Sequence, residues 1–113
     1  IYCDPNWTSE ALTNVIKNAI EHTPEGGQVI IRAENNPLFD LIEVQDSGEG
    51  ISDQDLPHIF ERFYKARNSS KESIGIGLAM SKSLLEKQNA TISARSHQGQ
   101  GSMFSIKFYK QVL

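Results

Sequence analysis

Residues 4–22 read DPNWTSEALTNVIKNAIEH and carry the pattern of an amphipathic helix. Apolar side chains recur in this stretch every three or four residues, which places them on one helix face: Ala11, Leu12, Val15, Ile16, Ala19 and Ile20. Asp4 can accept hydrogen bonds from the free N–H groups of the first turn, and Pro5 tolerates the first helical position. The sequence TPEGG at residues 23–27 then breaks the pattern. We therefore predict a helix over residues 5–22.

The rest of the chain alternates stretches typical of strands with a second long helix. Four stretches are apolar and bounded by turn-forming residues, which predicts strands at residues 28–34, 38–45, 90–96 and 102–109. The apolar spacing over residues 77–88 predicts the helix, and Ser52 with Asp55 resembles a capping box that opens a short helix toward Phe60. Hairpins at both ends with helices between them indicate an α+β fold. We expect a two-layer sandwich, with helices on one face of a mixed, mostly antiparallel sheet.

Length and composition indicate one ordinary globular domain. The chain has 113 residues, of which 38% are hydrophobic, and this suffices for a single core. Eleven basic and fourteen acidic side chains give a net charge of −3, which argues against binding nucleic acid by neutralising phosphates. Cys3 is the single cysteine and cannot form an intrachain disulfide. No apolar run approaches the about 20 residues that span a bilayer, so we expect a soluble domain without direct membrane contact.

One flank of the first predicted helix is polar. Asn14, Asn18 and His22 follow one another at intervals of four residues, so their side chains lie one turn apart on the same side. A solvated helix surface has the same pattern. The functional alternative is a metal site, because the side-chain oxygen of asparagine is a neutral, hard ligand that suits Mg²⁺.

Asp46 follows the second predicted strand, immediately before a bend that contains Gly48 and Gly50. Two glycines one residue apart indicate a turn too tight for ordinary side chains. A carboxylate there could simply cap the turn. It could also accept a hydrogen bond from the exocyclic amino group of adenine and repel the carbonyl oxygen that guanine carries at the same place.

Gly75, Ile76 and Gly77 lie at the start of the second predicted helix. The free N–H groups and the positive dipole end of that helix would face any anion bound there. The motif is weak by itself, and a dinucleotide-binding fold is disfavoured because no strand leads into it. The polar stretch of residues 65–73 carries three basic side chains, Lys65, Arg67 and Lys71. They are either solvated charges or a basic lid over phosphates.

These features form an ordered series of motifs along nearly the whole chain. The series is NVIKNAIEH (14–22), DSGEGI (46–51), IFERFYK (59–65), GIGLA (75–79) and GQGSMF (99–104). Together the motifs resemble the nucleotide-binding domain of sensor histidine kinases. The resemblance implies a Bergerat-type ATP-binding fold over residues 1–113, with ATP and Mg²⁺ as cofactors. An ordered set of five motifs is far more specific than a single glycine box.

The resemblance also implies roles for particular residues. It implies that Asn18 holds the Mg²⁺ on the triphosphate, that Asp46 binds adenine, and that Asn18 and Lys65 serve catalysis. The other nucleotide contacts that it implies are Asn14, His22, Gly48, Gly50, Ile51, Gly75, Ile76, Gly77, Leu78 and Ser102. Ser73 and Ile76 stand where the family's glycine box has its first glycine and its first leucine. Gly77 still opens the helix, so we expect the anion site to remain.

The implied reaction donates the γ-phosphoryl group of ATP to a histidine on a separate dimerisation domain of a two-component sensor kinase. In this family that histidine precedes an acidic residue, whereas the histidines here precede Thr23, Ile59 and Gln98. We therefore expect the phosphoacceptor domain to be absent from this chain, with the receiver domain of a response regulator as a further partner. The implied location is cytoplasmic, as the cytoplasmic domain of a membrane-bound sensor.

Two alternatives stay open at this point. An ATP-driven conformational clamp of the gyrase and chaperone type hydrolyses ATP with a glutamate that precedes the Mg²⁺-binding asparagine by four residues. Asn14 stands at that position and cannot take a proton. Neither Glu10 nor Glu21 has that spacing. The second alternative is a pseudokinase, which would bind nucleotide without transferring phosphate.

Overall fold

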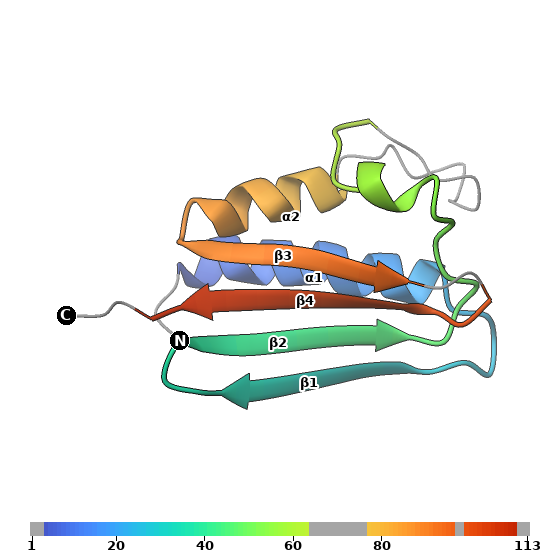
Figure 1. The fold of residues 1–113 in the computed structure, drawn as a ribbon, viewed down its shortest axis with the longest axis horizontal. Coiled ribbons are helices and arrows are strands. Elements are labelled where there is room, and N and C mark those ends of the chain that lie inside the picture. The colour runs from blue at the N-terminus through green and yellow to red at the C-terminus, as the bar shows by residue number, and fades with distance from the viewer. Residues whose placement is uncertain (1–3, 64–76, 97–98, 111–113) are drawn as a thin grey trace.

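A computed structural model describes residues 4–63, 77–96 and 99–110. The elements follow one another as α1 (Pro5–Glu21), β1 (Val29–Asn35), β2 (Phe39–Asp46), the 3₁₀ helix η1 (Leu56–His58), α2 (Gly77–Glu86), β3 (Ala90–Ser96) and β4 (Ser102–Tyr109). Figure 1 shows one sheet, with α1 behind its strands and α2 next to α1 and β3, and residues of both helices belong to one core cluster with the sheet. The expected α+β fold with two layers is confirmed.

The four strands are arranged in the order β1-β2-β4-β3, and each neighbouring pair is antiparallel. β4 comes last in the sequence but lies between β2 and β3 (Figure 1). In the middle of the sheet Phe104 is paired with Val44 on one side and with Ala94 on the other. Because β2 and β3 end where β4 begins, three chain segments meet at one end of the sheet.

The core lies between the sheet and the two helices. Val44, Phe104 and Ile106 are fully buried on the helix-facing side of the sheet. Val15 of α1 and Leu85 of α2 are fully buried opposite them. Burying one apolar side chain of this size stabilises the fold by about 1.5–3 kcal/mol. The apolar face predicted for the first helix therefore packs against the sheet.

α1 begins at the cap that the sequence predicts. The Asp4 side chain accepts hydrogen bonds from two backbone N–H groups of the first turn, each at 2.9 Å. The helix ends at Glu21, one residue earlier than expected, and His22 forms its C-terminal cap. Inside the core, the Ser81 hydroxyl of α2 donates to the backbone oxygen of Ala11 at 2.9 Å. This bond links the two helices.

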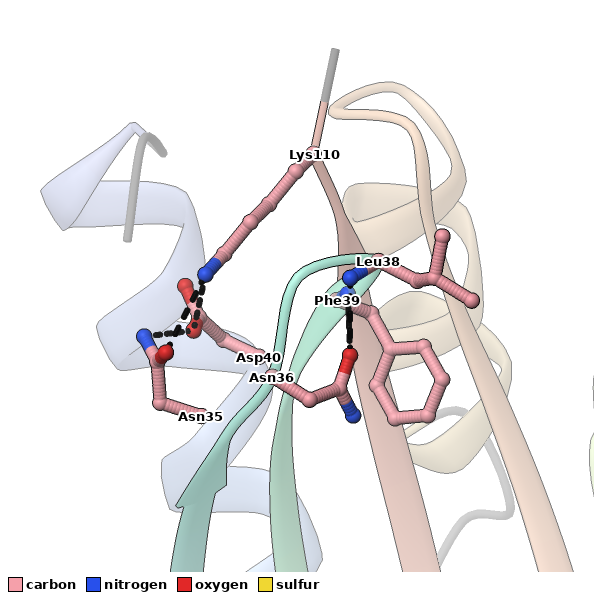
Figure 2. Close-up of polar contacts among 6 residues, drawn as sticks. All are labelled: Asn35, Asn36, Leu38, Phe39, Asp40 and Lys110. Atoms are coloured by element: carbon pink, nitrogen blue, oxygen red, sulfur yellow. Dashed lines mark hydrogen bonds and ion pairs between the residues drawn. The ribbon is translucent and has the colours of Figure 1, made fainter. Parts of the chain in front are cut away.

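The strands of the first hairpin begin one residue later than expected. For β2 the cause is Asn36, because its side-chain oxygen accepts from the backbone N–H groups of Leu38 at 2.8 Å and Phe39 at 2.9 Å (Figure 2). Asparagine commonly closes a turn by such bonds to the following backbone. Leu38 therefore belongs to the turn, and β2 begins at Phe39.

The short helix expected toward Phe60 is reduced to the three residues of η1. Pro57 lies inside it and has no N–H group to donate, which prevents a regular α-helix. The hydroxyl of Ser52 donates to Asp55 Oδ2 at 2.8 Å, and the Asp55 N–H donates back to Ser52 Oγ at 3.2 Å. The two residues are bonded to each other, but Asp55 accepts from the Ser52 hydroxyl, whereas a capping box uses the backbone N–H of the first residue, and the pair closes a turn before η1.

α2 is also shorter than the apolar spacing predicts. It ends at Glu86, two residues before the expected end. Asn89 has a φ of 59°, the left-handed conformation that commonly follows a helix end and turns the chain into the next element. Within the described ranges, neither this helix nor any other is long and apolar enough to cross a membrane.

A polar cluster closes the end of the sheet where β1 passes into β2 (Figure 2). The carboxylate of Asp40, a residue only 6% exposed, accepts from Asn35 Nδ2 at 2.6 Å. The Lys110 ammonium lies 3.5 Å from the same carboxylate oxygen and donates to Asn35 Oδ1 at 3.2 Å. The backbone N–H of Lys110 donates to the carbonyl of Leu38 at 2.9 Å. The cluster fastens the end of β4 to the first hairpin.

Candidate functional site

Asp46, Ser102 and Ser96 form a polar row across the opposite end of the sheet. The register pairs Asp46 of β2 with Ser102 of β4, and Ser102 with Ser96 of β3. Their exposed fractions are 4%, 6% and 8%, so all three are buried. Two residues further into the sheet, the same faces of β2 and β4 carry the core residues Val44 and Phe104. Polar side chains thus replace the apolar core at the end where β2 leaves the sheet.

The carboxylate of Asp46 is held by the loop that follows it. Its Oδ1 accepts a hydrogen bond from the backbone N–H of Gly48 at 2.9 Å, inside the protein. Gly50, two residues further on, has a φ of 77°. An ionised carboxylate has about four acceptor positions on its two oxygens. The bond to Gly48 therefore leaves Asp46 able to accept from an amino group of a ligand.

Two neighbouring elements press against the loop of residues 47–51. A Cβ on Gly48 would lie 1.9 Å from the backbone oxygen of His22, at the end of α1. A Cβ on Gly101, just before β4, would lie 2.1 Å from the backbone oxygen of Asp46. Real Cβ atoms essentially never come closer than 3.0 Å to such atoms. Glycine is therefore required at both positions, and the predicted tight bend is explained by the elements on either side of it.

Asn14, Asn18 and His22 lie half-buried along α1, one helical turn apart on the same flank. The start of α2 lies beside the first of them, since a Cβ on Gly77 would be 3.8 Å from the Cβ of Asn14. The last of them meets the loop of residues 47–51 through its backbone oxygen. The polar flank thus runs from the first turn of α2 to the loop after β2.

All of these parts lie at the same end of the molecule. Figure 1 shows the end of α1, the start of α2, the ends of β2 and β3 and the start of β4 there. The first turn of a helix has free N–H groups and the positive end of the helix dipole, which favour an anion. The site therefore combines a buried acceptor in Asp46, neutral amides on α1 and, at Gly77, a helix start whose dipole favours negative charge.

The other residues predicted for the site divide into two groups. Ile51 and Leu78 are half-buried and pack against the core, and Ser102 belongs to the polar row. Outside the described residues lie Lys65, Gly75, Ile76 and the remainder of the predicted lid at residues 65–73. The structure thus brings together the predicted site residues that it describes.

Sequence patterns alone assign no role to Ser96 or Gly101. The Ser96 hydroxyl oxygen accepts from the Ile51 N–H at 2.6 Å and lies 3.0 Å from the Gly101 carbonyl oxygen and 3.1 Å from Ser102 Oγ. A serine at an inward position of a predicted strand, opposite Ser102 in the closing hairpin, is the signal that points to it. Gly101 comes close to Asp46 because β2 pairs with β4, and short-range patterns do not reveal that pairing.

The family described as "Histidine kinase-, DNA gyrase B-, and HSP90-like ATPase" matches residues 3–112. The chain belongs to this ATPase family. The sensor protein SrrB of Staphylococcus aureus (strain NCTC 8325 / PS 47) is 34% identical over 110 residues, which cover 95% of this chain and 19% of SrrB. SrrB of strain MRSA252 is 34% identical over 119 residues, which cover 96% of this chain and 20% of that protein. The chain thus spans about a fifth of the length of the curated relatives it matches.

Solved structures of histidine kinases are similar to this chain. The mycobacterial sensor histidine kinase MprB superposes with a TM-score of 0.88 at 26% identity, over 100% of this chain and 78% of that one. The catalytic domain of the histidine kinase ThkA superposes with a TM-score of 0.82 at 24% identity, over 96% of this chain and 70% of that one, and supports the fold. The resemblance to sensor histidine kinases, and the ATP-binding fold that it implies, are confirmed.

ATP is usually bound together with Mg²⁺, so an ATP site also needs ligands for that ion. Among the residues that the structure describes, no group of three or more His, Cys, Asp or Glu side chains could hold a metal ion. Asn18 offers one neutral amide oxygen on the polar flank of α1. Mg²⁺ usually keeps several waters and shares its remaining positions with substrate phosphates. A single amide ligand therefore fits a Mg²⁺ ion that binds together with a nucleoside triphosphate.

Proposed function

We propose that residues 1–113 form the catalytic ATP-binding domain of a two-component sensor histidine kinase and that this domain binds Mg·ATP. The observation that carries the proposal is the buried Asp46, which lies beside Ser102 and precedes a loop clamped between α1 and β4. Membership of the ATPase family and 34% identity to proteins named as sensors support it.

Asp46 selects the base. An ionised carboxylate can only accept hydrogen bonds, so it binds the exocyclic amino group of adenine and repels the carbonyl oxygen of guanine. The missing side chain at Gly48 lets the backbone of the loop lie against the end of α1. The residues that we assign to the base and its surroundings are His22, Asp46, Gly48, Gly50, Ile51 and Ser102.

The triphosphate lies between the polar flank of α1 and the start of α2. Free N–H groups and the dipole of α2 favour its negative charge, and Gly77 carries no side chain there. The Asn18 amide oxygen holds Mg²⁺, which neutralises phosphate charge when bound. The remaining residues assigned to the phosphates are Asn14, Lys65, Gly75, Ile76 and Leu78.

The reaction moves the γ-phosphoryl group from ATP to an imidazole nitrogen of the acceptor histidine and leaves ADP. Such transfers depend chiefly on positioning and charge neutralisation, which is the catalytic role that we assign to Asn18 and Lys65. The acceptor lies on a dimerisation domain of the parent protein, and the receiver domain of a response regulator then takes the phosphoryl group. In this proposal the domain works in the cytoplasm.

A hydrolytic clamp is disfavoured by the residue one turn before Asn18. Asn14 occupies that place, and an amide cannot take a proton from an attacking water. Glu10 and Glu21 are exposed, and neither is four residues before Asn18. We therefore expect the chain alone to hydrolyse ATP slowly.

The fate of a label on the γ-phosphate of ATP distinguishes the three candidate functions, which are the kinase, the hydrolytic clamp and the pseudokinase. The chain is mixed with Mg·ATP labelled at the γ-phosphate, with and without the dimerisation domain of the parent kinase. We expect label on a histidine of that domain and little free phosphate when it is omitted. Rapid release of phosphate without the acceptor would support the clamp. ATP binding with neither reaction would support a pseudokinase, and absence of ATP binding would refute the proposal.

A further inference from the structure

We propose that Ser96, a residue outside the five motifs, positions the loop of residues 47–51 and orients the hydroxyl group of Ser102. The inference rests on the proposed function, since it concerns how well the pocket around Asp46 distinguishes adenine. Ser96 is a positioning residue and touches no nucleotide itself. It acts through Ile51 and Ser102.

The loop after β2 contacts Ser96 of β3, which lies on the other side of β4, so the loop has to pass over the end of β4. This follows from the strand order, in which β4 lies between β2 and β3. On the far side of β4, the Ile51 N–H donates to the hydroxyl oxygen of Ser96 at 2.6 Å. Halfway along, the Glu49 carbonyl accepts from the backbone N–H of Gly99 at 2.5 Å. Ser96 is thus the side chain that fastens the end of the crossing loop to the edge strand β3.

The three neighbours of the Ser96 hydroxyl determine its hydrogen bonds. A serine hydroxyl has one proton to donate and two lone pairs that accept. The Ile51 N–H can only donate, and the Gly101 carbonyl, 3.0 Å away, can only accept. Satisfying both leaves one lone pair of Ser96 for Ser102 Oγ at 3.1 Å, so Ser102 donates its proton to Ser96.

This arrangement makes Ser102 an acceptor toward the site. Its proton is committed to Ser96, so the hydroxyl group of Ser102 offers the ligand a lone pair. Asp46, directly opposite on β2, also only accepts. Residues directly opposite on antiparallel strands have Cβ atoms about 4.5–5.5 Å apart. The pair therefore suits a ligand edge that donates, as the amino group of adenine does, and disfavours the carbonyl edge of guanine.

Removing the Ser96 hydroxyl loosens one side of the loop and leaves the other intact. The Ile51 N–H and the Gly101 carbonyl lose a buried partner, and the Ser102 hydroxyl becomes free to rotate. Asp46 stays in place because its strand pairing is unchanged. The loop also keeps its contact with the end of α1 through Gly48. We therefore expect a loss of base affinity and selectivity, with phosphoryl transfer itself retained.

Hydroxyl deletion on the two faces of β3 tests the inference. Ser96→Ala removes the buried hydroxyl, Ser96→Thr keeps it, and Ser93→Ala removes an exposed hydroxyl from the same strand. Affinities for Mg·ATP and Mg·GTP are measured by calorimetry and competition. We expect Ser96→Ala to weaken ATP about tenfold, the size typical of a lost buried hydrogen bond, and to weaken GTP much less. Ser96→Thr and Ser93→Ala should stay within about twofold of the wild type.

Kinetics and hydrogen exchange provide the second readout. With an acceptor domain supplied, Ser96→Ala should raise KM for ATP about tenfold and leave kcat nearly unchanged, because the triphosphate contacts are untouched. A folded Ser96→Ala protein with unchanged ATP affinity and selectivity would overturn the inference. If that variant does not fold, rapid exchange of the Ile51 amide in the wild-type chain would overturn it equally. A wild-type chain that binds no ATP would instead refute the proposed function.

Discussion

Gly77 of α2 lies directly against Asn14 of α1. A Cβ on Gly77 would stand 3.8 Å from the Cβ of Asn14 and 3.9 Å from its Oδ1, which are ordinary van der Waals distances. Space alone therefore does not require glycine at this position. Gly48 differs, since a Cβ there would lie 1.9 Å from the backbone oxygen of His22. Lack of space thus requires glycine at position 48 but not at position 77, so substituting the two glycines should affect the stability of the domain differently.

Gly48→Ala should destabilise the domain, whereas Gly77→Ala should not. Adding a methyl group where no space exists costs about 1–3 kcal/mol, because the loop of residues 47–51 has to move away from α1. Alanine at the start of a helix is at least as favourable as glycine. Urea denaturation checks this, with the midpoint falling for Gly48→Ala and holding for Gly77→Ala. Equal midpoints for the two variants would contradict the clamped loop.

Asp46→Asn should weaken ATP binding at least about tenfold and reduce the preference for ATP over GTP. The Gly48 N–H still needs an acceptor, so the amide oxygen turns toward Gly48. The amide NH₂ group then faces the base, where it opposes the amino group of adenine and suits the carbonyl of guanine. Calorimetric titration of both nucleotides measures the two effects.

The matched control for that variant is Asp40→Asn at the other end of β2. Asp40 is buried to the same degree, but it bonds Asn35 and Lys110 and lies at the far end of the strand. We expect its ATP affinity to equal that of the wild type. Unchanged affinity in Asp46→Asn would remove the assignment of the base to Asp46, while a loss in both variants would point to a general change in the fold.

Asn18→Ala should abolish the gain in ATP affinity that Mg²⁺ provides and lower phosphoryl transfer by about 10–100-fold or more. The physical reason is the loss of the only amide that we assign to the ion. Binding of ATP without Mg²⁺ should be nearly unchanged, since Asp46 and α2 remain. Titration of Mg²⁺ at fixed ATP measures the effect, with the exposed Asn6→Ala on the first turn of α1 as control. Transfer at wild-type rate in Asn18→Ala would exclude this assignment.

The parts of the fold and of the site that the sequence predicts are those encoded by local patterns. The cap at Asp4, the helical spacing of Asn14 and Asn18, and the bend after Asp46 all depend on residues within a few positions of one another. The exact ends of the strands are harder to predict from the sequence. Leu38, for example, belongs to the turn and not to β2, because the Asn36 side chain bonds the backbone there. Such details depend on side-chain bonds that competing turn types also allow.

What the local patterns could not provide is the contact between segments far apart in the chain. Ser96 reaches Ile51 across 45 residues, and Gly101 meets Asp46 because β4 inserts beside β2. The His22 carbonyl constrains Gly48 through the packing of α1 on the sheet. The sequence does predict that glycines and a carboxylate are needed there, and the strand order supplies the reason.

Asp40→Ala should destabilise the domain by about 1–3 kcal/mol without changing its affinity for ATP. The substitution leaves the Asn35 amide, which donates to Asp40 at 2.6 Å, without this partner. Lys110→Ala should cost less, about 0–1 kcal/mol, because its ammonium lies 3.5 Å from the carboxylate and its side chain is 36% exposed. Urea denaturation gives both stabilities, and an ATP titration of each folded variant gives the affinities. Because the cluster and Asp46 lie at opposite ends of β2, a weaker affinity in folded Asp40→Ala would show that the two ends are coupled through the strand.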